Sequence, residues 1–473
     1  MILGVNQVAH VARPPAKPRL LYDGECKFCT LWMHRWQLAT GDFVECLPFQ
    51  DPRGAAQFPE ITRTQFDTAV QLVLPDGAVF SAAHAVCRSL ACNPEEQWLL
   101  ELYQHSPVFV RIAETAYRFV ARHRKFFSAT TWLLWGKQLE PPRQNLVRWI
   151  FLRSLGLVYL LAFLSLWPQI TGLVGSQGRA PVAITLTTAK INFAAQNIGA
   201  DRCHLMPTLC WFSTSDGFLN LQCFAGAALA VLLVLGVAPA PCLFLLWLIY
   251  LSLTTVCAVL PDLQWANLLL ETGLLAVVFA PLQLLPCEPA RETPPSRIAL
   301  WLLRWLLFRL MFAAGCLKSL GGDAAWLKPL SSLAMFSLDY VLPFFIFLPR
   351  RPRQLACGTF VLLQIVLLPS SSHVWFNVLT LLLCLTLLDD AALQSILPKA
   401  WQRGLPGLQK SSPRRQRRWA TAILLGAMVL AGCAGYTQFF KLVGLYMPGP
   451  EPVVAVNHWL RPLRAFNTYQ WPP

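Results

Sequence analysis

The chain has 473 residues, of which 55% are hydrophobic and 13% are charged. Soluble domains are about a quarter charged, so this composition excludes a wholly water-soluble globular enzyme and indicates a polytopic membrane protein. The 39 basic residues outnumber the 24 acidic ones, which gives a formal net charge of +15. Most of the basic residues lie before the first long apolar run or between runs, so they indicate topology, and we expect no nucleic-acid partner.

Residues 18–135 predict a soluble α/β domain, because the charge density there is ordinary and short apolar patterns alternate. Strand-like segments at 19–22 and 43–49 flank a segment with helical apolar spacing at 30–38. These three segments predict a βαβ unit.

A hairpin and three helices are expected to follow the βαβ unit. Pro75-Asp76-Gly77 separates two strand-like segments, and its proline presets φ while its glycine permits positive φ. Helical patterns cover residues 83–92, 95–106 and 108–126. A βαβ unit followed by a hairpin and a helix is the chain order of a thioredoxin-like fold, which is the fold we expect.

The strongest chemical signal is Cys26-Lys27-Phe28-Cys29, which follows the first strand and opens the first helix. A helix N-terminus stabilises a thiolate, so Cys26 is the expected attacking thiol and Cys29 the resolving one, joined in a redox-active disulfide when oxidised. The alternative, a zinc site, needs a second ligand pair at standard spacing, and since the sequence offers none we expect no metal. Asp23 either assists proton transfer at Cys26 or forms a turn or cap.

The string from Tyr22 to Cys29, with its Asp-Gly-x-Cys-x-x-Cys pattern, resembles the opening motif of the DCC family of thiol-disulfide oxidoreductase-like proteins. Pro75-Asp76-Gly77, Ala85-Val86 and the stretch from Pro107 to Arg124 are similar to that family's later pattern. The resemblance covers about residues 18–130 and implies a thioredoxin-like fold.

Residues 136–473 are expected to form an all-α membrane domain of about nine transmembrane helices. The apolar runs that predict them lie near 149–167, 217–236, 240–260, 265–285, 298–316, 331–348, 355–369, 373–388 and 419–436. The sixth to eighth runs are short or interrupted by Pro343 and Pro369, so one of them is an alternative candidate for a re-entrant or interfacial segment. The distribution of basic residues places the N-terminal domain on the cytoplasmic side.

Several separated strings in this membrane domain resemble the lipase maturation factor family. They run in chain order from Phe151-Leu152-Arg153 through Gln264-Trp265-Ala266-Asn267 and Phe308-Arg309-Leu310, with Lys318, to Phe376-Asn377-Val378. The resemblance implies a membrane factor that helps secreted lipases to fold and assemble, in the endoplasmic reticulum for eukaryotic members. The chain stops just after Phe466-Asn467-Thr468-Tyr469, so we expect the family's large C-terminal domain to be missing.

Ionisable side chains inside apolar runs are costly unless they pair or line a polar cavity. Glu271 and Arg309 are such residues, and we expect an ion pair that either lines a functional cavity or only locks two helices together. The other polar candidates of the membrane domain are Gln264, Asn267, Lys318 and Asn377. For Gln264 and Asn267 the alternative is a position near the end of a span, without further function.

These observations favour a redox-linked membrane factor that assists the maturation of exported proteins such as lipases and receives electrons from a thiol donor. One alternative is a membrane oxidoreductase or carboxylase-like enzyme that acts on a lipid-soluble quinone. Another is a transporter or scaffold in which the cysteine pair is a regulatory switch. No cofactor motif is evident. We expect a multi-pass protein of the lipid bilayer, in a bacterial inner membrane, or in the endoplasmic reticulum membrane of a eukaryote.

Overall fold

The fold is that of a computed structural model of the chain, which divides into two compact units. It describes residues 10–93, 97–136, 142–196, 202–257, 264–285, 294–320, 340–369, 374–396 and 459–464, with residues 426, 451 and 455. The first unit is Met1–Pro141 with Pro349–Arg351, and the second is Pro142–Leu348 with Pro352–Pro473.

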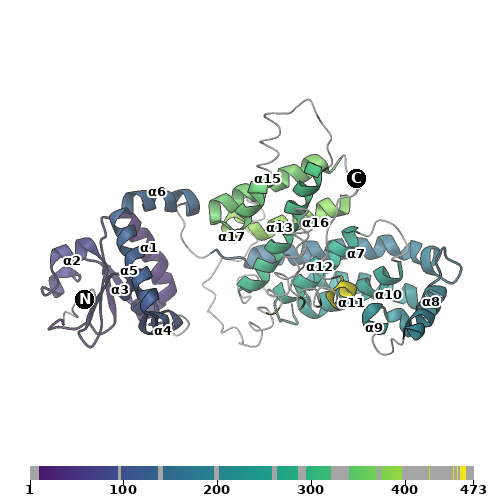
Figure 1. Ribbon diagram of the computed structural model, residues 1–473, viewed down its shortest axis with the longest axis horizontal. Helices are drawn as coiled ribbons and strands as arrows, with labels where there is room; N and C mark the ends of the chain where they lie inside the picture. Colours follow the sequence, from purple (N-terminus) through teal and green to yellow (C-terminus); the bar gives the residue numbers. More distant parts are fainter. Residues whose placement is uncertain are drawn as a thin grey trace, which may run out of the picture. The chain divides into compact units, whose positions relative to one another are not determined.

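A small mixed sheet forms the centre of the first unit (Figure 1). Its strand order is β2-β1-β3-β4, in which β1 (Arg19–Tyr22) is parallel to β2 (Glu45–Pro48). Strand β1 is antiparallel to β3 (Gln71–Val73), and β3 is antiparallel to β4 (Val79–Ser81). The parallel pair and the hairpin therefore occur as the sequence predicts.

Apolar side chains cover both faces of this sheet. Leu20 packs with Met33, Leu72 and Ala85 on one face, and its neighbour Leu21 packs with a second cluster on the other. Successive residues of a strand point to opposite faces, so a strand that is apolar throughout is buried on both sides.

Six helices of the first unit are described, and they are α1 (Lys27–Thr40), α2 (Arg63–Thr68), α3 (Ala82–Leu90), α4 (Gln97–His105), α5 (Pro107–Arg122) and α6 (Arg124–Trp135). The single helix expected at 108–126 is two helices, because His123 between them has a non-helical backbone (φ −112°, ψ 33°). Helix α6 therefore begins at Arg124 and takes a direction of its own (Figure 1).

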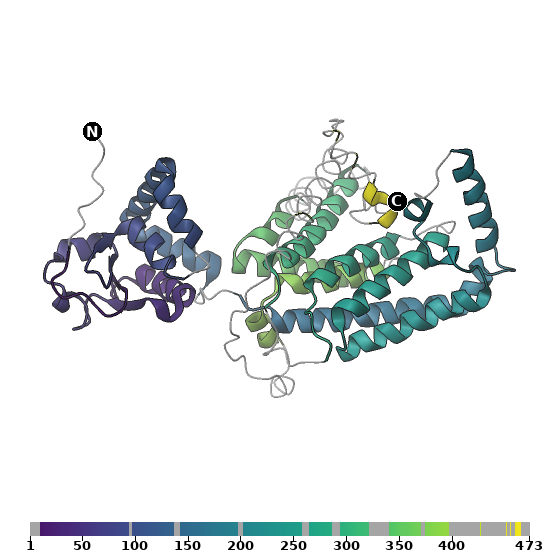
Figure 2. The same ribbon diagram turned by 90° about the horizontal axis from the view of Figure 1, so that it is seen from below.

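The second unit is mostly helical. Its described helices are α7 (Asn145–Val174), α8 (Val182–Ala195), α9 (Arg202–Leu205), α10 (Asp216–Leu235), α11 (Pro239–Val256), α12 (Gln264–Phe279), α13 (Arg297–Leu320), α15 (Arg350–Leu367), α16 (Val374–Cys384) and α17 (Asp390–Ile396). Helix α10 lies against both α7 and α11 (Figure 2). Gly273 of α12 allows close approach of α7, because a Cβ there would collide with the Tyr159 hydroxyl.

Three of the described helices, α7, α10 and α11, are long and apolar enough to cross a membrane. A fourth span is counted if residues Val374–Leu387 and α17, which meet at a bend of 119°, form one broken span. The nine predicted spans are thus not reached among the described residues. Two of the nine lie largely outside these residues, because the structure describes only part of the run at 331–348 and almost none of the run at 419–436. The first span, predicted to end at 167, continues through Pro168 to Val174.

Candidate functional site

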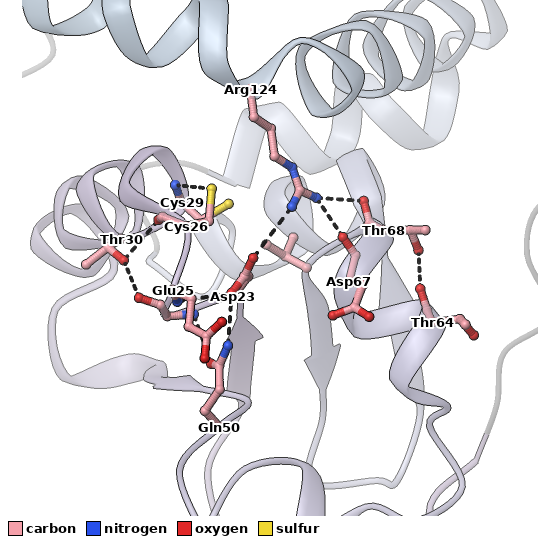
Figure 3. Close-up of polar contacts among 12 residues, drawn as sticks. Asp23, Glu25, Cys26, Cys29, Thr30, Gln50, Thr64, Asp67, Thr68 and Arg124 are labelled. Carbon is pink, nitrogen blue, oxygen red and sulfur yellow. Dashed lines mark hydrogen bonds and ion pairs between the residues drawn. The ribbon is translucent and has the colours of Figure 1, made fainter.

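The cysteine pair lies where β1 gives way to α1. Cys26 is the N-cap of α1, and its Sγ accepts a hydrogen bond from the Cys29 N–H at 3.4 Å (Figure 3). Both thiols are free and partly buried. The Cys26 sulfur thus lies at the positive end of the α1 helix dipole.

The loop before the helix is held by Gln50, which follows β2. Gln50 Nε2 donates to Asp23 Oδ1 at 2.9 Å, while Gln50 Oε1 accepts from the Gly24 N–H at 3.0 Å. Asp23 Oδ1 also accepts from the Glu25 N–H at 3.1 Å, which is the turn-forming role expected as its alternative. A Cβ at Gly24 would lie 2.7 Å from the Pro48 Cβ, so this loop needs a glycine.

Arg124 brings a positive charge to the same place from the start of α6. Its Nη1 lies 3.8 Å from Asp23 Oδ2, and its Nη2 donates to the carbonyl oxygens of Asp67 and Thr68 at 3.1 and 3.0 Å (Figure 3). The sequence placed Arg124 in a family-like string but did not identify it as a site residue. The feature of the sequence that could have identified Arg124 is the family-like stretch from Pro107 to Arg124, which ends at this residue.

The two cysteines differ in their surroundings. Burial, followed by a hydrogen bond to Cys26 and the charge of Cys26, raises the pKa of Cys29 to about 12. The charge of Arg124 lowers the pKa of Cys29, and the charge of Asp23 raises it. Cys29 is therefore a protonated, inner thiol at neutral pH, behind a Cys26 sulfur at the helix end.

The Cys46 thiol on β2 also has a raised pKa. Burial, followed by the charge of Glu45, raises the pKa of Cys46 to about 12. Among the residues that the structure describes, no group of three or more His, Cys, Asp and Glu side chains is arranged to hold a metal ion.

In the second unit, Glu271 and Arg309 form an ion pair between α12 and α13. Arg309 Nη2 donates to Glu271 Oε1. Only 1% of the Glu271 side chain and 7% of the Arg309 side chain are exposed. The pairing is the one expected from the sequence, and its burial inside an apolar unit makes the two charges mutually dependent.

The remaining polar candidates do not join this pair in the described contacts. Asn267 Oδ1 accepts from Arg464 Nη1 at 2.9 Å. Asn377 of α16 is fully buried, and neither of its amide atoms has a hydrogen-bond partner among the described residues. Gln264 begins α12 and Lys318 lies near the end of α13, but both side chains fall outside the described part of the structure.

Two further arginines, Arg304 in an apolar run and Arg353 before one, bind backbone carbonyls near the end of α16. Arg304 Nε and Nη2 both donate to the Thr386 carbonyl at 3.0 and 2.9 Å, and Arg353 Nε donates to the Leu387 carbonyl at 2.9 Å. A helix end leaves carbonyls without intrahelical partners, and these arginines satisfy two of them. The position of Arg304 is explained by this contact and does not require the side chain to reach the membrane surface.

A cavity of about 220 Å³ lies among α7, α11, α12 and α16. Apolar and aromatic side chains, among them Leu161, Trp265 and Trp375, form most of its wall. Tyr250 also lines it and is 3% exposed. The cavity thus combines a mostly apolar wall with a few polar side chains, which are Ser165, Gln169, Tyr250 and Thr254.

Comparison with known proteins relates the two units to two families. A family model described as the lipase maturation factor transmembrane domain matches residues 146–337 and 324–395, which together are more than half of the chain. A model described as DCC1-like thiol-disulfide oxidoreductase matches residues 20–129. No solved structure gives a significant match.

Individual relatives carry the same family name. Lipase maturation factor 2 of Xenopus laevis is 35% identical over 287 residues, covering 52% of this chain and 39% of the relative. Lipase maturation factor 1 of Bos taurus is 30% identical over 365 residues, covering 68% of this chain and 64% of the relative. Human lipase maturation factor 2 is 35% identical over 296 residues, covering 52% and 40%. The chain spans less than two thirds of the length of each of these relatives.

Proposed function

This chain belongs to the lipase maturation factor family and is an integral membrane protein with a DCC1-like domain, and from that premise we propose that it assists the maturation of exported proteins by thiol–disulfide exchange at Cys26 and Cys29. Lipases are the proposed clients, in keeping with the names of the relatives. The observation that carries the redox part of the proposal is the contrast between the two thiols, one at a helix N-cap and one inside with a pKa of about 12.

The proposed exchange uses this contrast in two steps. The Cys26 thiolate attacks one sulfur of a substrate disulfide, forms a mixed disulfide and releases the other substrate sulfur as a thiolate, which takes up a proton. Cys29 then loses its proton and attacks Cys26, which releases the substrate as a dithiol and leaves Cys26 and Cys29 oxidised. A thiol donor returns two electrons to the pair.

Asp23 and Arg124 have proposed roles in the second step. Cys29 must become a thiolate to resolve the mixed disulfide, although its pKa of about 12 opposes this. Arg124 lowers that pKa, and the carboxylate of Asp23 is the proposed acceptor of the proton. The ion contact between Asp23 and Arg124 keeps the two groups together beside the pair.

The side of the membrane decides which substrate is available. We place the first unit in the cytoplasm on the distribution of basic residues, where small thiols keep dithiols reduced. The unit would then supply electrons for maturation and would not exchange directly with exported clients. Labelling of Cys26 by a membrane-impermeant thiol reagent only after cell lysis is the expected result, and labelling in intact cells with the outer barrier opened contradicts this placement.

The exchange itself is tested by trapping. A Cys29→Ser variant of the full chain cannot resolve the mixed disulfide, so we expect it to accumulate a covalent, dithiothreitol-sensitive complex with a thiol partner. A matched Cys26→Ser, Cys29→Ser variant keeps every other cysteine and is expected to trap nothing. Absence of a complex in the first variant, or equal amounts in both, contradicts the proposed exchange.

A second candidate function is an oxidoreductase that acts on a lipid-soluble quinone, and the cavity beside Tyr250 favours it. The Tyr250 hydroxyl would donate a hydrogen bond to a quinone oxygen, and the apolar wall would hold the ring. Quinone that co-purifies with the full chain and is lost from a Tyr250→Phe variant supports this function. Full retention in that variant, or no quinone with the unaltered chain, argues against it.

A further inference from the structure

The outer side of α5 combines apolar and basic side chains. Val108, Ile112 and Phe119 are 67%, 61% and 56% exposed. Arg111, Arg118 and Arg122 are exposed beside them. At 3.6 residues per turn, the spacings 108-112-119 and 111-118-122 form two adjacent stripes along one side of the helix. We call this surface, made of these six residues, the outer face of α5.

The core of the first unit does not use the outer face. The opposite side of α5 packs Phe109, Val110 and Ala113 against α3 and α4, and Tyr117 accepts a hydrogen bond from the Val70 N–H at 3.0 Å. Burial of large apolar side chains is the usual source of stability, so three such side chains left in solvent on one helix indicate a further contact.

The charge around the outer face has one sign. Glu114 is the one acidic residue between Pro107 and Gly136. It is directed into the unit, where its Oε1 accepts from the Tyr103 hydroxyl at 2.9 Å and from the His84 N–H at 3.2 Å. The arginines of the outer face therefore have no carboxylate beside them on α5. A partner surface with negative charge complements this arrangement.

Helix α6, which follows α5 in the chain, carries the same kinds of exposed side chain. Phe126 and Leu133 are 65% and 62% exposed, and Lys125 is exposed next to Phe126. Nine residues separate Trp135, the end of α6, from Asn145, the start of the first membrane-spanning helix. The first unit is thus tethered to a bilayer by a short link.

We propose that the outer face of α5 is a docking surface for the anionic headgroup layer of the bilayer. Val108, Ile112 and Phe119 insert at the boundary between headgroups and acyl chains, as the apolar side of an interfacial helix does. The arginines extend along the helix surface and pair with lipid phosphates, for which the guanidinium fork is suited. Docking orients the first unit on the membrane that holds the second. This inference does not depend on thiol chemistry at Cys26.

The full chain in lipid nanodiscs provides the test. Amide hydrogen exchange of the α5 peptides is compared between discs of phosphatidylcholine alone and discs in which half of the lipid is phosphatidylglycerol. We expect slower exchange of α5 in the anionic discs. Arg111→Gln with Arg122→Gln is expected to weaken docking about 30-fold, because each basic residue near an anionic surface contributes roughly fivefold.

Two matched variants separate charge, apolar contact and folding. Arg13→Gln with Arg63→Gln removes the same charge from exposed positions elsewhere in the unit and is expected to keep α5 protected in anionic discs. Ile112→Ser, at a 61% exposed position, is expected to reduce that protection. Equal α5 exchange in both kinds of disc overturns the proposal. Protection that persists in detergent and is unaffected by the Arg111 and Arg122 changes also overturns it, because a protein surface then covers the outer face.

Discussion

Arg124 Nη1 lies 3.8 Å from Asp23 Oδ2, which places two opposite charges beside the Cys26-Cys29 pair (Figure 3). The arginine is held in place by the Asp67 and Thr68 carbonyls, and the aspartate by Gln50. Burial is the main cause of the raised pKa of Cys29, and Arg124 and Asp23 change that pKa in opposite directions. The contact therefore gives the site two side chains through which its redox properties can be altered.

The first prediction is that Arg124→Gln and Asp23→Asn change the pKa of Cys29 in opposite directions. In a Cys26→Ser background, loss of Arg124 leaves less Cys29 thiolate and is expected to slow alkylation of Cys29 about fivefold, the equivalent of about 1 kcal/mol. Loss of the Asp23 charge favours the Cys29 thiolate and is expected to accelerate alkylation by a similar factor. Timed alkylation at about pH 8, read by peptide mass spectrometry, measures both rates.

A matched control for this prediction is Arg63→Gln, which removes an exposed arginine from the first turn of α2 and is expected to leave the alkylation rate of Cys29 unchanged. If Asp23 and Arg124 only order the loop, both variants loosen the same structure and change that rate in the same direction. Shifts of equal sign thus reject an electrostatic role for the two residues.

The second prediction concerns the pH dependence of alkylation. Burial is the largest cause of the raised pKa of Cys29, and a Cys26→Ser variant keeps that burial, so Cys29 in this variant should react slowly with iodoacetamide at about pH 8. Because the pKa of this acidic group is raised, its rate should still be increasing with pH above about pH 10. Peptide mass spectrometry after timed alkylation of folded protein measures the rate. A plateau below about pH 10 is incompatible with the inner, protonated role of Cys29.

The sequence predicted the parts of the site that lie close together in the chain. Cys26, Cys29 and Asp23 belong to one short string, and the helix that follows them has a clear apolar pattern. Arg124 was not identified, because its place depends on where α6 starts and on how it packs. The break at His123, which fixes that start, interrupts an apolar pattern that continues through it.

In the membrane-spanning unit, Glu271 and Arg309 stood out because charges are rare inside apolar runs. Arg304 and Arg353 donate to carbonyls near the end of α16, where the chain bends by 119° before α17. No pattern of side chains in the sequence predicts such a bend. The nine predicted spans are not confirmed among the described residues for a related reason. Helix α12 has 16 residues, and α15 begins with three arginines within its first four residues, although both contain apolar runs.

The third prediction concerns Asp390, which caps the first membrane-spanning helix from elsewhere in the chain. Asp390 Oδ2 accepts from the Asn145 N–H at 3.0 Å, and its Oδ1 accepts from the Val147 N–H at 3.1 Å. Asp390→Ala removes both acceptors from buried donors and is expected to destabilise the protein by about 1–3 kcal/mol. Asp390→Asn keeps one carbonyl acceptor, so its loss should be smaller. Denaturant unfolding in detergent measures the difference, and equal stability of all three proteins contradicts the capping role.

The fourth prediction is a double-variant cycle on Glu271 and Arg309. Either Glu271→Leu or Arg309→Met alone leaves one buried charge without its main partner and is expected to destabilise the protein by about 3–5 kcal/mol. Glu271→Leu with Arg309→Met replaces the whole pair by apolar side chains of similar size and is expected to cost much less. Unfolding of each purified protein in detergent gives the three free energies.

The same cycle decides between the two readings of the pair. If the pair only locks α12 to α13, the Leu and Met variant should be folded and should still support secretion of active lipase in a cell that depends on this chain. If the pair also takes part in function, that variant should fold and yet fail in the secretion assay. A double variant that is destabilised as much as either single one rejects the mutual dependence of the two charges, because removing the second charge would then relieve nothing.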